Sequence, residues 1–520
     1  MLLKSLFGAS ALLSATAFAA FGVVDSGTQL TVDTNGGLVF KVSKSTGDIV
    51  SLVYNGLECQ DSSKFSHISS GLGSSNVVAT TSGSAIKITV TTSTLTQYYI
   101  AKSGDPIVYM ATYITAEPTV GELRFIARLR KTSLPNSVVL ASEVNGGTVV
   151  EGEDVFMING QTRSKFYSSK RFIDDQVHCV TGSGVGVCMV VPGYSYESSS
   201  GGPFFRDIDN QGSAQQELYF YMNSGHVQTE AYRMGLHGPY GLVFTSGGAA
   251  SSSLDFSFFS SLSITGFVPA GSRGFVSGTV SGVASDGVVH WKSSAAQYWT
   301  KSTGAFTSPA MKPGSYTMVL YSGEYEVAST TVSVSAGSTT SKSIAATAGT
   351  ASVIFRIGTV DGRPTGFKNA ANQAIMHPSD SRMSSWSPTT FTVGSSSTAD
   401  FPMAQVKTVN DPTIIRVTLT AAQAASARTL KVYTTLSFAG GRPSVVFNSF
   451  TAATPAAPTK IDSRGFTRGA YHGYNEVYSF AIPAAQLISG SNTISIGCAS
   501  GSTGASFLNP NFIYDSIELF

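Results

Sequence analysis

The sequence predicts an all-β protein made of three successive domains, and two observations lead to this prediction. Short runs rich in β-branched and aromatic residues recur between Gly, Asn and Ser turns, as at residues 37–42, 85–90 and 352–357. Long amphipathic helical patterns are missing, and residues 421–427 offer at most one helical turn inside a loop. Short strands separated by turns are typical of stacked β-sandwiches.

The first residues have the order of a secretory signal peptide. Lys4 precedes the apolar run Ser5–Leu13, and small residues then lead to the A-x-A pattern at Ala17–Ala19. This run is shorter than the ~20 apolar residues that span a bilayer, and no later segment reaches that length. We therefore expect residues 1–19 to be a signal peptide and the mature protein to be secreted, extracellular and without a membrane partner.

Changes in composition divide the remaining chain into three predicted domains. Residues 20–260 hold most of the unusual polar clusters, and a Gly/Ala/Ser-rich junction lies near their end. Residues 261–347 have the strand-turn-strand pattern of a small β-sandwich and end in an Ala-Gly-Ser-Thr run. Residues 348–520 contain many aromatic residues, end in an alternating strand, and look like a carbohydrate-binding jelly roll.

Charge and cysteine content restrict the partners and the covalent structure. The chain has 33 basic and 31 acidic residues, so it lacks the basic excess of nucleic-acid-binding proteins and we expect no nucleic-acid partner. Cys179 and Cys188 bracket the Gly-rich turn VTGSGVGV, which favours a local disulfide in an oxidising compartment. A zinc site is the weaker reading, because no His-Cys cluster surrounds them. Pairing between Cys59 and Cys498 stays open.

Two segments of the first predicted domain combine basic and aromatic residues. The first is TRSKFYSSKRF, which contains Lys165 and could also be an ordinary solvated loop. In the second, Tyr219 and Tyr221 are two residues apart, so on a strand they share a face. The turn residues NSG then place His226 at the end of this strand. A lone His is more often structural, but its position beside two tyrosines makes it a candidate catalytic residue.

Several sequence blocks resemble one known family. GELRFIARL, TRSKFYSS-x-RFIDDQ-x-HC, ESSSGGPFFRDI and MNSGHVQTE-x-YRMGLHGPY are similar to blocks of the fungal rhamnogalacturonan lyases of polysaccharide lyase family 4. The resemblance continues through SPAMKPG, GEYEVA, GRPTGFKNAANQ and MHPSDSRMSSW and covers essentially the whole mature chain. It implies a galactose-mutarotase-like β-sandwich, then a fibronectin-III-like domain, then a jelly roll.

The resemblance also implies a substrate, a reaction and a set of site residues. The substrate is rhamnogalacturonan I, cleaved by β-elimination at the rhamnose-α-1,4-galacturonate bond. The implied residues are the catalytic pair Lys165 and His226 and the substrate contacts Arg124, Tyr219, Tyr221 and, more weakly, Arg468 of the third domain. A guanidinium such as that of Arg124 suits the uronate carboxylate, which must be neutralised as it becomes enolate-like. Lys165 as base and His226 as acid is the assignment we favour, and the reverse stays open.

Parts of the sequence are also compatible with two other functions and with a bound metal ion. A glycoside hydrolase would need two opposed carboxylates, for which the first domain offers Glu151, Glu153, Asp174 and Asp175 without indicating a pair. A non-catalytic carbohydrate-binding protein is the other alternative. The spacing Asp207-Ile208-Asp209 suits oxygen ligands, so a structural Ca²⁺ is allowed. We expect no metal or other cofactor in catalysis, and a monomer.

Overall fold

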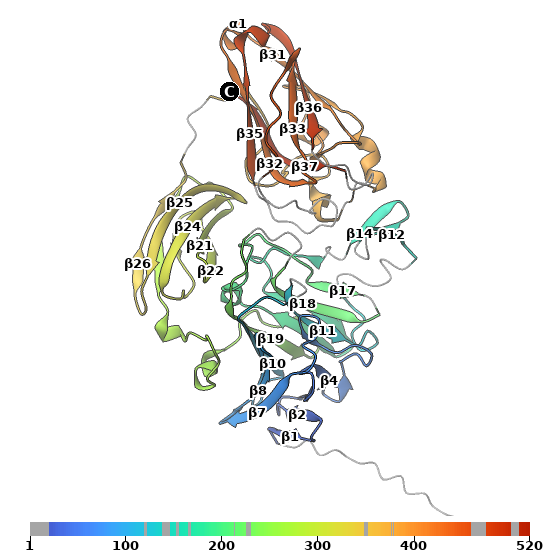
Figure 1. The fold of residues 1–520 in the computed structure, drawn as a ribbon, viewed down its shortest axis with the longest axis vertical. Helices are drawn as coiled ribbons and strands as arrows, with labels where there is room; N and C mark the ends of the chain where they lie inside the picture. Colours follow the sequence, from blue (N-terminus) through green and yellow to red (C-terminus); the bar gives the residue numbers. More distant parts are fainter. Residues whose placement is uncertain are drawn as a thin grey trace, which may run out of the picture.

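The computed structural model describes residues 20–118, 122–137, 146–151, 155–164, 168–212, 214–224, 230–347, 352–375, 377, 379–458, 475–500 and 509–520. Residues 1–19, where the signal peptide is expected, lie outside these ranges. Three β-rich bodies follow one another along the chain, with the blue and green first domain at one end of the molecule and the red third domain at the other (Figure 1). Among the described residues, no helix has the length and apolar character needed to cross a membrane.

In the described residues, the first domain and its junction with the second contain four antiparallel sheets and three short 3₁₀ helices. One sheet consists of β1 (Gly22–Asp25), β2 (Gln29–Asp33), β3 (Leu38–Ser43), β4 (Ile49–Tyr54) and β5 (Leu57–Glu58). The largest has the order β15 (Val177–Gly182), β16 (Val185–Val190), β19 (Gly235–Thr245), β10 (Ile107–Ile114), β9 (Leu95–Lys102), β8 (Ala85–Thr91) and β7 (Asn76–Ser82). The other two consist of β17 (Asn210–Gly212), β18 (Gln216–Asn223), β11 (Leu123–Leu129) and β6 (His67–Ile68), and of β12 (Thr148–Glu151), β13 (Val155–Ile158) and β14 (Gln161–Ser164). The helices are η3 (Gly193–Tyr196), η4 (Ser257–Ser261) and η5 (Ala270–Ser272).

The larger sheets of the first domain share one apolar core. Phe40 on β3, Ile88 on β8, Phe125 on β11 and Phe220 on β18 belong to one cluster and are buried. Burying each such side chain contributes roughly 1.5–3 kcal/mol, so alternate residues of these strands are strongly directed inward. The residues between them, including Arg124 on β11, are consequently directed to the opposite face of the β17-β18-β11-β6 sheet.

The second and third domains are each built from two sheets in the described residues. The second packs β23 (Ala305–Thr307), β20 (Phe275–Ser281), β26 (Thr339–Ser341) and β27 (Ile344–Ala345) against β22 (Gln297–Lys301), β21 (Gly287–Lys292), β24 (Gly314–Ser322) and β25 (Tyr325–Val334). The third packs β28 (Phe355–Gly358), β37 (Asn511–Leu519), β32 (Arg428–Phe438), β35 (Glu476–Ile482) and β30 (Ala404–Val406) against β29 (Thr390–Thr392), β31 (Thr413–Leu419), β36 (Gly490–Ala499), β33 (Arg442–Phe447) and β34 (Phe450–Thr451). Its helices are η6 (Ala370–Ile375), η7 (Ser381–Trp386), η8 (Thr398–Asp400), α1 (Ala421–Ala424) and η9 (Ala484–Gln486).

The predicted all-β, three-domain fold class is confirmed, with one local correction. Residues 38–43 and 85–91 are strands, as expected, and α1 is a single turn that begins at a Thr420–Gln423 capping box. The strand predicted at residues 352–357 begins only at Phe355, where pairing with Leu519 starts. Cys179 and Cys188 face each other on β15 and β16 and form the predicted disulfide, whereas Cys59 and Cys498 are buried free thiols.

A buried carboxylate joins the first domain to the second. Glu197 follows η3, and its oxygens accept hydrogen bonds from Arg273 at 2.7 and 3.1 Å and from the Tyr298 hydroxyl at 2.6 Å. The ammonium of Lys312 lies 2.9 Å away. Burial by itself would raise the pKa of Glu197, but the hydrogen bond from Arg273 and the charges of Lys312 and Arg273 lower it. The interface between these domains therefore depends on an ionised carboxylate.

We predict that Glu197→Gln lowers the free energy of unfolding by about 3 kcal/mol, because it leaves the buried Arg273 and the partly buried Lys312 without their counter-ion. Asp25→Asn is the matched control, since Asp25 pairs with Lys44 on the exposed surface and its loss should have little effect on stability. Because the pKa of Glu197 is lowered by folding, its contribution is present near neutral pH and is lost as pH falls. Urea midpoints measured at several pH values check this; equal losses in the two variants would contradict it.

Candidate active site

The candidate active site lies on the β17-β18-β11-β6 sheet, on the face opposite its apolar core. β11 and β18 are antiparallel neighbours, with Arg124 opposite Tyr221 and Ile126 opposite Tyr219. The register shifts between Leu123 and Arg124, which marks a β-bulge. This pairing brings together three of the predicted substrate contacts from positions about 95 residues apart in the sequence.

Arg124 is held between a carboxylate and an aromatic ring. It forms an ion pair with Glu122, and its Nη1 donates to the Tyr221 hydroxyl at 3.3 Å. Its guanidinium carbon lies 5.4 Å from the centroid of the Tyr221 ring. Burial opposes the charge of Arg124, but Tyr221, Tyr219 and Asp207 together outweigh it and the pKa is raised. The buried Nε donates to none of the described residues, so one hydrogen-bond donor of the guanidinium is unmet there.

The two tyrosines stack and continue into a polar row that was not predicted. The Tyr219 and Tyr221 rings lie 5.6 Å apart at 25°, and the Tyr219 hydroxyl donates to Glu217 at 2.6 Å. Glu217 accepts from Arg128 at 3.0 Å, and the Arg128 Nη1 lies 3.2 Å from the His67 ring. The position of Arg128 could have been predicted from the sequence, because it lies four residues from Arg124 and so shares its face on a strand. The position of His67 could not, because its strand has only two residues and shows no periodicity.

The carboxyl group of Glu117, which follows β10 in the sequence, lies against the end of β18. Asn223, two residues after Tyr221, donates to Glu117 at 2.8 Å. Burial raises the pKa of Glu117 to about 7, although the hydrogen bond from Asn223 opposes the shift. Glu117 was not predicted, because it lies in the segment after β10, where no strand pattern sets it apart. It adds a group that titrates near neutrality beside the strand end that precedes His226.

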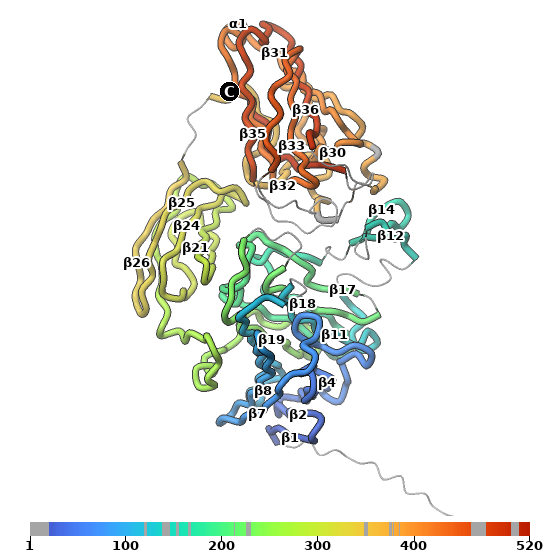
Figure 2. Tube along the Cα trace, in the orientation of Figure 1, coloured from blue at the N-terminus to red at the C-terminus, as the bar shows by residue number. Residues whose placement is uncertain are grey.

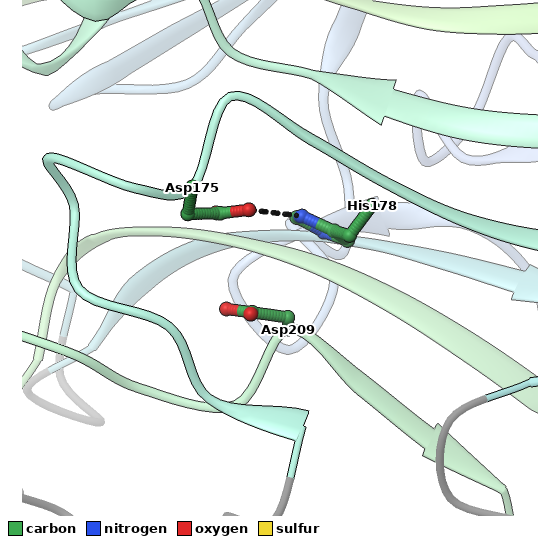
Figure 3. A group of neighbouring side chains, drawn as sticks. All are labelled: Asp175, His178 and Asp209. Atoms are coloured by element: carbon green, nitrogen blue, oxygen red, sulfur yellow. Dashed lines mark hydrogen bonds and ion pairs between the residues drawn. The ribbon is translucent and has the colours of Figure 1, made fainter. Parts of the chain in front are cut away.

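A buried cluster anchors the main chain of the tyrosine strand. Asp175 and His178 face each other at 2.8 Å, with Asp209 below them in the view (Figure 3). The other ring nitrogen of His178 lies 2.8 Å from the Tyr219 carbonyl oxygen, and the Tyr219 N–H donates to the Asp209 carbonyl at 2.9 Å. The Tyr196 hydroxyl donates to Asp175 at 2.9 Å. The cluster thus fixes both main-chain polar groups of Tyr219.

The two carboxyls of this cluster have opposite charge preferences. Burial raises the pKa of Asp209, and the negative charge of Asp175 raises it further. Burial also disfavours the ionised form of Asp175, but the charge and hydrogen bonds of His178 and Tyr196 lower its pKa. Folding therefore favours the ionised form of Asp175, which faces His178, and the protonated form of Asp209.

The same cluster is the group of described residues whose ligand atoms could surround a metal, lying within 4.8 Å of one another. Both ring nitrogens of His178 already face oxygen acceptors, so neither presents a free lone pair. Imidazole is also not a ligand of Ca²⁺, which takes oxygen donors. Of the predicted Asp207–Asp209 pair, only Asp209 joins this group. The arrangement fits an anchor for β18 better than a cation site.

Three predicted site residues, Lys165, His226 and Arg468, lie outside the described residues. The hydrolase alternative is tested in part, since Asp174, Asp175 and Glu151 are described. Asp174 forms ion pairs with Arg171 and Lys301, Asp175 is buried against His178, and Glu151 lies 3.3 Å from His377 of the third domain. Each of these carboxylates therefore has a basic partner of its own, and Glu153 lies outside the described ranges.

The chain thus has a large β-sandwich domain with an arginine and two stacked tyrosines on one sheet, followed by two smaller domains of two sheets each. A family model described as rhamnogalacturonan lyase B, N-terminal, matches residues 21–266, and models for domains II and III of polysaccharide lyase family 4 match residues 272–342 and 353–519. The chain belongs to polysaccharide lyase family 4.

Proteins named as rhamnogalacturonate lyases match this chain over nearly the full length of both sequences. Rhamnogalacturonate lyase A of Aspergillus aculeatus is 57% identical over 529 residues, which cover 100% of both chains. Rhamnogalacturonate lyase A of Emericella nidulans is 57% identical over 530 residues with the same coverage. A probable rhamnogalacturonate lyase A of Aspergillus fumigatus is 58% identical over 512 residues, which cover 97% of this chain and 96% of the relative.

We predict that Asp209→Asn and Asp175→Asn have very different effects at neutral pH. Asp209→Asn keeps the shape of the protonated carboxyl that folding favours and should change the free energy of unfolding by less than about 1 kcal/mol, whereas Asp175→Asn removes the buried carboxylate that His178 and Tyr196 contact and should cost about 3 kcal/mol. Because folding raises the pKa of Asp209, wild-type stability should fall as pH rises above the usual carboxyl range. Asp209→Asn should remove that dependence. Urea unfolding between pH 4 and 8 measures both effects; a large loss at neutral pH in Asp209→Asn would refute the assignment.

Proposed function

We propose that this chain cleaves the rhamnose-α-1,4-galacturonate bonds of rhamnogalacturonan I by β-elimination, acting as a secreted, extracellular monomer. A base takes the proton from C5 of the galacturonate, the C–H electron pair becomes the C4=C5 double bond, and the oxygen on C4 leaves with the rhamnose and is protonated. The product carries a 4,5-unsaturated galacturonate at its non-reducing end. The observation that carries the proposal is Arg124, whose buried Nε lacks a described acceptor beside the stacked tyrosines. The relatives named rhamnogalacturonate lyase supply the substrate class.

Arg124 has the chemistry that the difficult step requires. The C5 proton is very weakly acidic because the neighbouring carboxylate is already negative, so the transition state needs a fixed cation at that carboxylate. A guanidinium can hold both carboxylate oxygens in one plane, and it stays charged at every working pH. Tyr219 and Tyr221 are buried and stacked beside Arg124, and the Tyr221 hydroxyl accepts a hydrogen bond that helps to hold the guanidinium in place.

Lys165 and His226 are the proposed base and acid, with the reverse assignment open. Lys165 lies three residues before Ser168, whose hydroxyl donates to the Asn210 carbonyl at 2.7 Å on β17, next to β18. His226 lies two residues after Ser224, which directly follows the last residue of β18. Ser168, three residues after Lys165, and Ser224, two residues before His226, thus both adjoin strands of the tyrosine sheet. Arg468 of the third domain is a further proposed substrate contact.

The decisive experiment compares the wild type with Lys165→Ala and His226→Ala on debranched rhamnogalacturonan. We expect ultraviolet-absorbing unsaturated oligosaccharides from the wild type, and a rate at least about 100-fold lower from each variant, because each removes a proton-transfer group. Unchanged affinity for the polymer would show that the variants still fold and bind. New reducing ends without ultraviolet absorbance would instead indicate hydrolysis, and binding without any product would indicate a carbohydrate-binding protein.

We also propose that Arg124, and not a metal ion, neutralises the uronate carboxylate. Two treatments distinguish these two possibilities. Arg124→Lys keeps the charge but loses the planar fork, and should lower kcat/KM by about 100-fold. Exhaustive treatment of the wild type with a calcium chelator should leave kcat/KM unchanged. Loss of activity on chelation that added Ca²⁺ restores would overturn this proposal, and a drop in thermal stability alone would reveal a structural ion.

A further inference from the structure

The small sheet β12-β13-β14 stands apart from the other sheets of the first domain. In the described residues its strands pair only with one another, and β14 ends at Ser164, the residue before Lys165. Asn159 and Gly160, with φ of 52° and 76°, form the two-residue turn between β13 and β14. Such a small sheet has little core of its own, so its position must be fixed by what it packs against.

The partner of this sheet is the third domain. The Ser381 N–H donates to the Gly160 carbonyl at 2.7 Å, at the tip of the β13–β14 hairpin. One oxygen of Asp380 accepts from the Thr162 N–H at 2.7 Å and from the Thr162 hydroxyl at 3.1 Å. Thr162 is 1% exposed and Asp380 2%, so these bonds lie in a closed interface. The tube view shows the strands β12 and β14 beside the lower end of the third domain (Figure 2).

A second contact holds the first strand of the sheet. His377 Nε2 lies 3.3 Å from the Glu151 carboxylate at the end of β12, and both residues are buried. His377, Asp380 and Ser381 come from one short stretch of the third domain. The sheet is therefore held at both of its edge strands by the same segment.

Asp380 is itself fixed to the core of the third domain. It caps η7 by accepting from the Arg382 N–H at 2.8 Å, and the Arg382 side chain donates to both of its oxygens at 2.8 and 2.7 Å. Met383 and Trp386 of η7 belong to the apolar core of the jelly roll. Burial would raise the pKa of Asp380, but the hydrogen bonds from Arg382 and Thr162 lower it to about 2, so the acceptor stays charged. The contacts lead without a break from the jelly-roll core to β14.

We propose that the third domain positions the β13–β14 hairpin through Asp380 and Ser381, and thereby sets the starting point of the chain that carries Lys165. Asp380 and Ser381 are positioning residues in this account, and the jelly roll is a required part of the catalytic apparatus rather than an independent binding module. The inference rests on the proposed function, because it takes Lys165 as a reacting group. A displacement of about 1 Å at such a group can lower the rate about 100-fold, so the support of the hairpin matters for turnover.

Ser381→Pro tests this with little disturbance of the third domain. Ser381 is the first residue of η7, where proline is favoured, and Asp380 has the extended conformation that precedes proline, with φ −68° and ψ 139°. The substitution removes the N–H that binds Gly160 and puts a ring carbon in its place. We expect kcat on rhamnogalacturonan to fall at least about tenfold, KM to change less than about threefold, and hydrogen exchange across residues 155–164 to quicken.

Thr398→Pro is the matched control. Thr398 is the first residue of η8 in the same domain, follows the extended Ser397, and its N–H donates to none of the described residues. It should leave kcat and the exchange of residues 155–164 at wild-type values. Asp380→Ala, which removes the acceptor of Thr162, should reproduce the loss of kcat seen in Ser381→Pro.

Each other outcome contradicts the positioning role. Wild-type kcat in Ser381→Pro and Asp380→Ala would overturn it, whatever the hydrogen exchange shows. A lower kcat without faster exchange in the hairpin would exclude this route, and a raised KM with unchanged kcat would make the third domain a binding module. Lys165→Ala separates the two proposals: an active Lys165→Ala refutes the proposed function, whereas an inactive Lys165→Ala with an active Ser381→Pro refutes only the positioning.

Discussion

The pairing of β11 with β18 is the constraint on which the rest of the site depends. It sets Arg124 opposite Tyr221 and Arg128 opposite Glu217, and it leaves Phe125 and Phe220 in the core on the other face. A slip of one residue would exchange the two faces, burying an arginine and exposing a phenylalanine. The cost of that exchange is several kcal/mol, so the apolar core specifies the position of the charged groups without contacting them.

The arginines described on this face are paired with carboxylates, but one of their hydrogen-bond donors is unmet. Arg128 is paired with Glu217, and beneath the strand Asp175 faces His178 while burial raises the pKa of Asp209. Arg124 has Glu122 and the Tyr221 hydroxyl, yet its buried Nε has no acceptor among the described residues. An unmet donor of this kind costs free energy. The proposed contact of Arg124 with a uronate carboxylate would offset that cost, because a carboxylate is a strong, planar acceptor.

Local features of this fold were predictable from the sequence, and contacts between distant residues were not. Two-residue periodicity placed Tyr219 and Tyr221 on one face, and a short Gly-rich turn predicted the Cys179–Cys188 bond. That Arg124 meets Tyr221 follows from strand pairing across about 95 residues, which no local pattern encodes. The contact of Thr162 with Asp380 spans 218 residues and two domains. For Arg124, the family resemblance supplied what periodicity could not.

The way the domains are joined favours one fixed body over tethered modules. Glu324 of the second domain is 2% exposed and accepts a hydrogen bond from Arg171 of the first domain at 3.1 Å. Its main-chain N–H donates to Asp361 at 2.7 Å, and its carbonyl accepts from Asn475 at 2.7 Å, both in the third domain. Burial raises the pKa of Glu324 against the lowering effect of the arginines around it, so the carboxylate depends on their staying in place. Buried charged groups tolerate little displacement, because each lost partner leaves a desolvated charge. The relative positions of the three domains are therefore set by the same contacts that hold them together.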